Sequence, residues 1–404
     1  MAKENMSKLE RLIQLYCPDG VEYVKLDSVA NICRGTRVVK SQLSDKGYPV
    51  YQNCLTPMGY FERSNCNAGI TFVICGGAAG NVGYTDVECW AADDCEFIIG
   101  GHQVINRYIY YYLMTKQNYL LSKVRKASIP RLSPSIIKDL EIPLPPLPVQ
   151  EEIVRILDAF TELQAELQAE LQKRKQQYNY YLDNLLNFNN INRGGYQAEV
   201  RWMKMSDIGT FYSGLSGKTK EDFQNGNAKF ISYVNIFNNL SLITDVDDRV
   251  KIHEGERQNT IQYGDLLFTS SSETPDECGM CSVLTHHTEE KLYLNSFCFG
   301  FRFNDLSGIN PEFMKFLFRS SVIRKLICKT ANGVTRFNIS KKEFAKIVIP
   351  IPSLAEQDHI ASVLDKFYFL VGDLTAGLPA EIEKRRQQYE YYRDKLLTFK
   401  RKGA

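Results

Sequence analysis

The 404-residue sequence has no run of about 18 apolar residues and no signal-peptide pattern, so we expect neither a membrane-spanning helix nor secretion. It also lacks a strong excess of charge, because 49 Lys and Arg stand against 47 Asp and Glu. A net charge of +2 does not exclude a nucleic-acid partner, but it requires local basic patches or help from other subunits. The hydrophobic fraction of 44% is typical of a globular chain, and the length is enough for two or three domains.

The sequence also lacks cysteines and histidines at the spacing of a metal site. The one CxxC motif, Cys278 to Cys281, has no second pair and only scattered histidines nearby, so we expect no zinc. The cysteines that follow no metal-ligand pattern include Cys54, Cys66, Cys75, Cys89 and Cys95. Because the chain carries no export signal, we expect its eleven cysteines to be reduced thiols.

Catalytic motifs are absent from the sequence. An adenine methyltransferase should carry an Asn/Asp-Pro-Pro-aromatic motif, and there is none. The segment GLSGKT at 214–219 suggests a phosphate loop, but the pattern GxxxxGK[ST] requires glycine where the chain has Tyr212. The segment GGAAGNVG at 76–83 lacks the GxGxxG spacing of a dinucleotide site. We therefore expect no catalytic residues, no metal and no cofactor in this chain.

What the chain does contain is an internal repeat. One copy begins at Ile142 with IPLPPLPVQEEIVRILDAF, and the other begins at Ile349 with IPIPSLAEQDHIASVLDKF, an offset of 349 − 142 = 207. Further on, the first copy has KRKQQYNYYLDNLLNF from Lys173 and the second has KRRQQYEYYRDKLLTF from Lys384, an offset of 384 − 173 = 211. The copies therefore differ by 211 − 207 = 4 residues between two matching flanks.

The four-residue difference falls at a tetrapeptide repeat, TELQAELQAELQ at 161–172. Ala, Leu, Gln and Glu are strong helix formers, and four residues are close to one helical turn. Each copy predicts a helix of about 40 residues, ~60 Å long, with the apolar stripe of a coiled coil. Pro379 should kink or break the second helix. We interpret the tetrapeptides as a spacer whose length matters, with favourable helix sequence as the alternative.

The segments before the two helices resemble each other at their ends and diverge between them. The first begins with EYVKLDSVANICRG and the second with RWMKMSDIGTFYSG. Both contain short β-like runs, such as ITFVI at 70–74 and DLLFT at 265–269. We expect two similar α/β domains, 20–141 and 197–348, each followed by a helix.

This layout resembles the DNA specificity subunits of type I restriction-modification enzymes over essentially the whole chain. Its most specific marks are the two proline-rich helix starts, the paired KRxQQYxYY segments and the tetrapeptides between them. The expected fold is α/β (α+β), with target recognition domains at 20–141 and 197–348. Two long antiparallel coiled-coil helices, in 142–196 and 349–404, separate them. Residues 1–19, which contain ERLIQL, resemble the helix ends DNLLNF and DKLLTF and would complete a pseudo-two-fold circular repeat.

The resemblance implies a non-catalytic, cytoplasmic subunit. Each domain would read one half of a bipartite, asymmetric site in double-stranded DNA, and the helices would dock two methyltransferase (modification) subunits. Restriction motor-nuclease subunits would join for cleavage. S-adenosylmethionine, ATP and Mg would be bound by these partners. Two other hypotheses remain: a protein-only scaffold with twin domains on a helical spacer, and a self-contained enzyme, which the missing motifs disfavour.

Contacts with DNA need Lys and Arg for phosphates, and Arg, Asn and Gln for base edges. Two basic clusters at corresponding places, KVRKASIPR and KTANGVTR, are stronger signals than any single residue, which can equally be a solvated surface charge. The amides that follow strands can instead bond their own backbone. The glycine-rich segment at 76–83 is either a tight turn or a loop that approaches DNA. The candidates are Arg34, Arg37, Lys40, Gln52, Asn53, Gly77, Lys123, Arg125, Lys126, Arg131, Lys218, Lys220, Asn235, Ser271, Arg336, Lys341 and Lys342.

The tyrosine-rich helix segments are the expected subunit interface. Their tyrosines could stack on nucleic acid, but their spacing follows the apolar stripe and favours packing against a partner helix or subunit. The predicted interface residues are Tyr178, Tyr181, Leu185, Tyr389, Tyr392 and Leu396.

Overall fold

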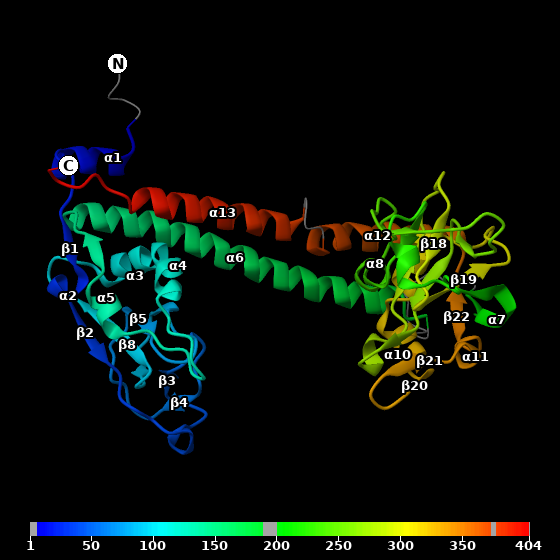
Figure 1. Ribbon diagram of the computed structural model, residues 1–404, viewed down its shortest axis with the longest axis horizontal. Coiled ribbons are helices and arrows are strands. Elements are labelled where there is room, and N and C mark those ends of the chain that lie inside the picture. The colour runs from blue at the N-terminus through cyan, green and yellow to red at the C-terminus, as the bar shows by residue number, and fades with distance from the viewer. Residues whose placement is uncertain (1–5, 189–199, 373–376, 404) are drawn as a thin grey trace. The chain divides into compact units, whose positions relative to one another are not determined.

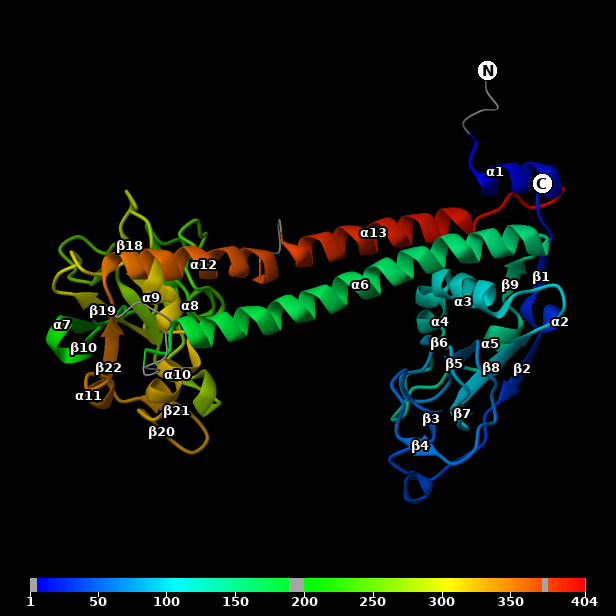
Figure 2. The same cartoon turned by 180° about the vertical axis from the view of Figure 1, so that it is seen from behind.

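The computed structural model of the chain describes residues 6–188, 200–372 and 377–403 (Figures 1 and 2). The chain divides into two compact units. Unit 1 comprises residues 1–169 and 381–404, and unit 2 comprises residues 170–380. Both boundaries fall inside the helical segments, and the first lies within the tetrapeptide repeat. Each unit therefore includes part of the helical segments.

Unit 1 is built on an antiparallel sheet in the order β2-β8-β5-β6. Its strands are β1 (Tyr23–Lys25), β2 (Ala30–Arg34), β3 (Tyr48–Tyr51), β4 (Tyr60–Phe61), β5 (Ile70–Ile74), β6 (Val82–Thr85), β7 (Trp90–Ala91), β8 (Cys95–Gly100) and β9 (Glu141–Pro143). Its shorter helices are α1 (Lys8–Tyr16), α2 (Leu26–Val29), α3 (Asn106–Thr115), α4 (Gln117–Ser122) and α5 (Pro134–Lys138).

The predicted strand at 70–74 is the fully buried strand β5 of this sheet. Ile70, Phe72 and Ile74 belong to one apolar cluster, whereas Val73 packs into the other, which includes residues of helix α3. This alternation follows from the two-residue period of a strand, which sends successive side chains to opposite faces. An uninterrupted apolar run therefore suits a strand covered on both sides.

Unit 2 repeats the arrangement with a sheet in the order β11-β19-β15-β17. Its strands are β10 (Arg201–Lys204), β11 (Gly209–Ser213), β12 (Ala228–Ile231), β13 (Arg249–Val250), β14 (Thr260–Ile261), β15 (Leu266–Thr269), β16 (Ser271–Ser272), β17 (Cys281–Val283), β18 (Leu292–Leu294), β19 (Cys298–Phe303), β20 (Ala331–Asn332), β21 (Phe337–Ile339) and β22 (Val348–Ile351). Its shorter helices are α7 (Met205–Ile208), α8 (Tyr233–Asn238), α9 (Pro311–Leu317), α10 (Ser321–Cys328) and α11 (Lys341–Phe344).

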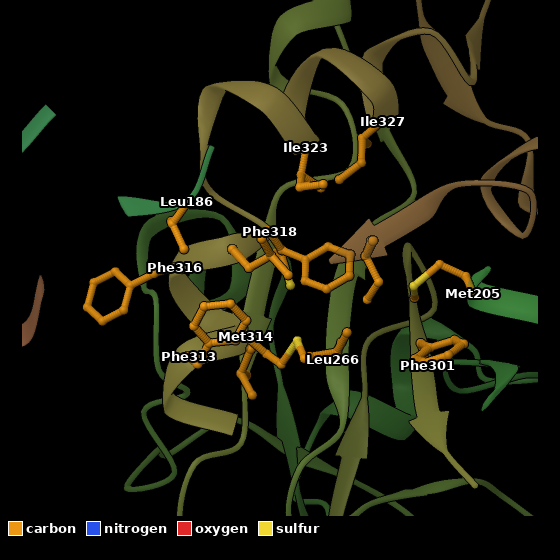
Figure 3. Packing of buried hydrophobic residues seen from close by; sticks show 14 of the residues in the cluster. Leu186, Met205, Leu266, Phe301, Phe313, Met314, Phe316, Phe318, Ile323 and Ile327 are labelled. Atoms are coloured by element: carbon orange, nitrogen blue, oxygen red, sulfur yellow. The ribbon is translucent and has the colours of Figure 1, made fainter. Parts of the chain in front are cut away.

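The core of unit 2 is rich in phenylalanine, and Figure 3 shows part of it around Leu266 of β15. Leu186, just after the first long helix, packs in the same core as Phe313 and Phe316. The end of that helix is therefore held by the apolar interior of unit 2.

The first copy of the repeat forms one long helix, whereas the second copy forms two helices, in agreement with the interruption predicted from Pro379. Helix α6 (Leu147–Leu185) runs without interruption for 39 residues through the tetrapeptides. The second copy is described as α12 (Leu354–Gly372) and α13 (Leu378–Leu396). Pro379 lies in the first turn of α13, where its missing N–H is tolerated. Within the described residues, no helix is long and apolar enough to span a lipid bilayer.

Equivalent residues anchor the helix start in both units. The buried Gln150 accepts from the Ile105 N–H at 3.0 Å and donates to the carbonyls of Gln103 and Pro145. Gln357, its counterpart, makes the same three bonds: it accepts from the Asn310 N–H and donates to the carbonyls of Gly308 and Pro352. The repeat seen in the sequence is thus also a repeat of internal hydrogen bonds.

Equivalent aromatic pairs join the long helices. In unit 1, Phe160 stacks on Tyr392 with ring centroids 5.6 Å apart. In unit 2, Tyr181 stacks on Phe367 at 4.9 Å. The later residue of α6, Tyr181, pairs with the earlier residue of the second copy, Phe367. The two contacts therefore have the antiparallel order expected from the sequence.

The two ends of the chain meet inside unit 1, as the circular repeat predicts. The Val21 N–H donates to the Lys400 carbonyl at 2.8 Å, and the Lys402 N–H donates to the Val21 carbonyl at 3.0 Å. Leu9 of α1 and Leu397 are buried in one apolar cluster. The first and last residues of the described chain therefore complete one structural unit.

Candidate nucleic-acid interface

Unit 1 has an open hollow of about 340 Å³ beyond the end of β5, which we call hollow 1. Three connections meet there: the end of β2, the turn between β7 and β8, and the loop that precedes α5. Its lining residues are Arg34, Cys75, Asp93, Asp94, Glu96, Arg125, Arg131, Leu132, Ser133 and Pro134. Three predicted DNA-binding arginines are therefore brought together at one place.

Backbone hydrogen bonds hold the loops around hollow 1. The Leu132 N–H donates to the Cys75 carbonyl at 3.0 Å, and the Gly77 N–H donates to the Pro130 carbonyl at 3.1 Å. The Ala78 N–H donates to the Asn53 carbonyl at 2.8 Å. The glycine-rich segment is thus a turn fastened to both neighbouring loops, so the tight-turn interpretation is confirmed and contact with DNA stays a prediction.

The backbone geometry at position 77 requires glycine. Its φ is +83°, which side-chain-bearing residues rarely adopt, and an added Cβ would lie 2.7 Å from the Asn53 Cβ. Gln52 is half-buried and Asn53 is exposed, and both lie directly after β3. The structure therefore places the predicted Gln52, Asn53 and Gly77 beside the loop that carries Arg131.

The charges of hollow 1 are arranged with acids inside and arginines outside. Arg131, whose side chain is 51% exposed, binds the Asp94 carboxylate at 3.1 Å. The Arg34 Nε donates to the Asp93 carbonyl at 2.9 Å. Glu96 is buried, and this burial raises the pKa of its carboxyl. Burial also raises the pKa of the Cys75 thiol to about 12, so this thiol is neutral.

Unit 2 has a larger hollow, about 920 Å³, at the topologically equivalent place, which we call hollow 2. It follows β15 as hollow 1 follows β5, and β12 pairs in parallel with β18 as β3 does with β7. Its lining residues are Tyr233, Val234, Phe237, Asn238, Ser271, Ser272, Glu273, Glu277, Phe297, Thr335 and Arg336. The predicted Ser271 and Arg336 are therefore brought together, and the Arg336 Nε donates to the Ser271 Oγ at 3.2 Å.

The lining of hollow 2 is aromatic where that of hollow 1 is charged. Tyr233 and Phe237 stack with centroids 6.0 Å apart, and the Tyr233 hydroxyl donates to the Ser271 carbonyl at 2.8 Å. Phe297 and Val234 are 59% and 62% exposed, which is unusual for apolar side chains beside a cavity. The same scaffold thus presents two different chemical surfaces.

Sequence reasoning missed the acids of hollow 1 and the aromatics of hollow 2. Asp93, Asp94 and Glu96 carry the charge that DNA repels, so a search for basic residues passes over them. Phe297 lies in the segment LNSFCFG at 294–300, which contains no basic residue. Only the meeting of distant loops reveals these residues.

Six further candidates, all exposed and outside the two linings, stay predictions. In unit 1 they are Arg37, Lys40, Lys123 and Lys126, and the last two lie in the loop that carries Arg125. In unit 2 they are Lys220 and Lys342.

Two candidates are corrected by the structure. Asn235 is buried, and its amide both donates to the Ile243 carbonyl and accepts from the Ile243 N–H. The Lys218 side chain is only 4% exposed, and its ammonium binds the Glu256 carboxylate at 2.6 Å. Since these two polar groups already have internal partners, they serve the fold. Lys341 is half-buried beside the Phe299 ring and donates to the Ser213 hydroxyl, and its contact with DNA stays a prediction.

The predicted subunit-interface residues make contacts within the chain. Tyr178, Tyr181 and Leu185 pack against the core of unit 2, and Tyr389 and Leu396 pack against that of unit 1. Tyr392, which is 36% exposed, stacks on Phe160 of the same chain. These contacts agree with packing against a partner helix, and docking of another subunit at these residues stays a prediction.

A comparison with known protein families gives one match to each half of the repeat. The model of the family described as type I restriction modification DNA specificity domain matches residues 18–196 and again residues 197–384. A type I restriction enzyme specificity subunit from Escherichia coli is 32% identical over 317 residues, which cover 74% of this chain and 72% of that protein. A Haemophilus influenzae protein named for the same kind of subunit is 30% identical over 428 residues, covering 98% of this chain and all of that protein.

Solved structures agree in fold. The crystal structure of the S subunit of a type I restriction-modification system from M. genitalium has a TM-score of 0.55 and 16% identity, covering 93% of this chain and 95% of that one. A chain from a study of complex assembly in the type I R-M system has a TM-score of 0.57 and 16% identity, covering 94% and 98%. At this identity the likeness concerns the fold alone.

Proposed function

This chain belongs to the family of type I restriction-modification DNA specificity subunits, with two target recognition domains, and from that premise we propose that it reads a bipartite, asymmetric DNA site. Each unit reads one half-site through its hollow and the basic loop beside it. The observation that carries the proposal is the pair of equivalent hollows with different linings. One scaffold that presents acids and arginines in one unit and aromatic rings in the other suits recognition of two different sequences.

We further propose that the chain docks two methyltransferase subunits through a repeated tyrosine. Tyr180 and Tyr391, the first members of the two Tyr-Tyr pairs, are 64% and 62% exposed. Each packs edge-on against the tyrosine that follows it, at 5.6 Å and 5.3 Å, so its ring is supported but still open to a partner. Exposed, rigid aromatic rings are frequent anchors of protein interfaces. Two equivalent anchors, one in each unit, match two copies of one partner.

In this proposal catalysis belongs to the partners. The methyltransferase subunits bind S-adenosylmethionine and methylate adenine, and motor-nuclease subunits, which require ATP and Mg, join through them. Purified chain alone is expected to transfer no radiolabelled methyl group to DNA. Transfer by a homogeneous preparation of the chain would contradict this assignment.

Exchange of one domain tests independent reading. Residues 20–141 are replaced by the matching segment of another family member, and the chain is assembled with the same methyltransferase subunits. Sequencing that detects methylated adenines should show one half-site changed and the other retained. If both half-sites change together, the two units do not read independently. A protein-only scaffold would produce no methylated motif and no binding to duplex DNA that weakens with rising salt.

Substitution of the exposed tyrosines tests docking. Tyr180→Ala and Tyr391→Ala should each weaken binding of one methyltransferase copy, and the double variant should weaken both, as measured by the mass of the assembled complex. Tyr60→Ala, at a ring that is 40% exposed on β4, is the matched control. An unchanged two-copy complex with the double variant would contradict this docking site.

A further inference from the structure

The floor of hollow 1 contains a buried acid without a hydrogen-bonding partner. Glu96, in β8, is 5% exposed, and among the described residues its carboxylate receives no hydrogen bond. The nearby guanidinium of Arg34 and ammonium of Lys138 only partly offset the rise that burial causes in its pKa. The Asp93 Oδ1 in the same lining is a buried atom without a partner. Buried polar atoms are nearly always satisfied, so Asp93 Oδ1, together with the unbonded Glu96 carboxylate that lines the hollow, indicates a ligand that supplies donors.

The rim of the hollow limits what that ligand can be. Arg34, Arg125 and Arg131 surround the acids, and Arg131 is held in place by Asp94. Three guanidinium groups disfavour a free metal cation. They do favour the phosphates and base acceptors of DNA. A ligand that presents two adjacent acceptors beside a donor suits both the arginines and the acids of the hollow.

One base pair has this pattern. In the major groove, guanine presents its O6 and N7 acceptors, which arginine binds, while its cytosine partner presents the N4 amino donor, which a carboxylate accepts. An adenine·thymine pair also presents an amino donor, but it lacks the two adjacent acceptors, N7 and O6 of guanine, that one arginine binds with two donors. Resting on the proposed function, we infer that Glu96 accepts from the N4 amino group of a cytosine in the unit 1 half-site, and that Arg131 binds the paired guanine.

The first test needs no substitution. The wild-type chain is assembled with its methyltransferase subunits, its methylated motif is mapped, and the domain exchange of 20–141 identifies the unit 1 half-site. That half-site should contain a specified C·G pair. If the complex methylates a bipartite motif whose unit 1 half lacks such a pair, this inference is wrong while the proposed function stands. If no bipartite motif is methylated, the proposed function itself fails.

The second test changes the acid. In Glu96→Gln the side chain gains a donor beside its acceptor, which matches the N6 and N7 of adenine. The preference for cytosine over adenine at that position should fall by about tenfold or more, with the unit 2 half-site unchanged. Glu88→Gln, at an exposed acid of the same domain, is the control and should leave the motif unchanged. An active Glu96→Gln complex with the wild-type motif would overturn the inference.

A third variant keeps the test possible if Glu96→Gln does not fold. If thermal melting shows that Glu96→Gln does not fold, Arg131→Gln replaces an exposed side chain and should relax the same C·G position by a similar factor. Relaxation at a different position, or at none in an active complex, would also overturn the inference.

Discussion

A change of length in α6 is the most direct test of how the two half-sites are spaced. The repeat at 161–172 lies inside the uninterrupted helix, and the boundary between the two compact units falls between Ala169 and Glu170. Deleting residues 165–168 removes one tetrapeptide and keeps leucine at every fourth position. Duplicating the same residues adds one. Because the deleted or duplicated residues, Ala165, Glu166, Leu167 and Gln168, are all strong helix formers, both variants should keep the helix intact.

Helix geometry sets the size of the effect. Four residues change the length of a helix by ~6 Å and turn its end by ~400°, a net rotation of ~40°. One base pair of B-DNA rises ~3.4 Å and turns ~34°, at about 10.5 pairs per turn. The rotation therefore matches one base pair, while the length alone would suit one to two. A five-residue insertion adds ~100° more and would turn one hollow away from its groove.

The assay is the methylated motif of three length variants, each assembled with the same methyltransferase subunits. We expect the unspecified spacer to shorten or lengthen by about one base pair while both half-sites are preserved. The five-residue insertion is the control and should lose methylation. Active variants with an unchanged spacer would show that the tetrapeptides are only favourable helix sequence and do not set the distance.

Two further predictions concern stability. Gln150→Ala leaves three backbone groups without their hydrogen-bonding partner and should lower the free energy of unfolding of unit 1 by about 2–4 kcal/mol. Gln357→Ala should do the same in unit 2, as measured by chemical denaturation. A loss below about 0.5 kcal/mol would contradict this. The hydrogen bond from Arg155, with help from Lys8, lowers the pKa of the buried Glu152 to about 2. Because the folded pKa lies below the ordinary value of about 4.3, this carboxylate stabilises unit 1 above pH ~4.3, and the contribution disappears as the pH falls towards 2. Glu152→Gln should therefore weaken the acid dependence of melting in that window, and an identical dependence would refute the assignment.

Several features could be predicted because they depend on local pattern. The β-like runs ITFVI at 70–74 and DLLFT at 265–269 coincide with the buried core strands β5 (Ile70–Ile74) and β15 (Leu266–Thr269). Pro379 predicts an interruption of the second helix, and α13 begins at Leu378, one residue before this proline. The tyrosine pairs show the limit of such patterns. The helical period indicates which residues share a stripe, but it does not say which tyrosine faces the neighbouring helix. Tyr181 is stacked on Phe367, whereas Tyr180 is left exposed.

The sequence by itself determined the repeat, the two long helices and the family, because each is written in residues that lie next to one another in the chain. Only the tertiary structure decided which side chains line the two hollows, because those come from loops far apart in sequence. Asn53 and Ala78 meet through a backbone hydrogen bond, and Arg131 meets Asp94 through an ion pair. The sequence presents Asn235 as available, but folding places it in the interior. Glu96 is an acid and so does not suggest a contact with DNA, but folding places it in the lining of a hollow, without a hydrogen bond to its carboxylate.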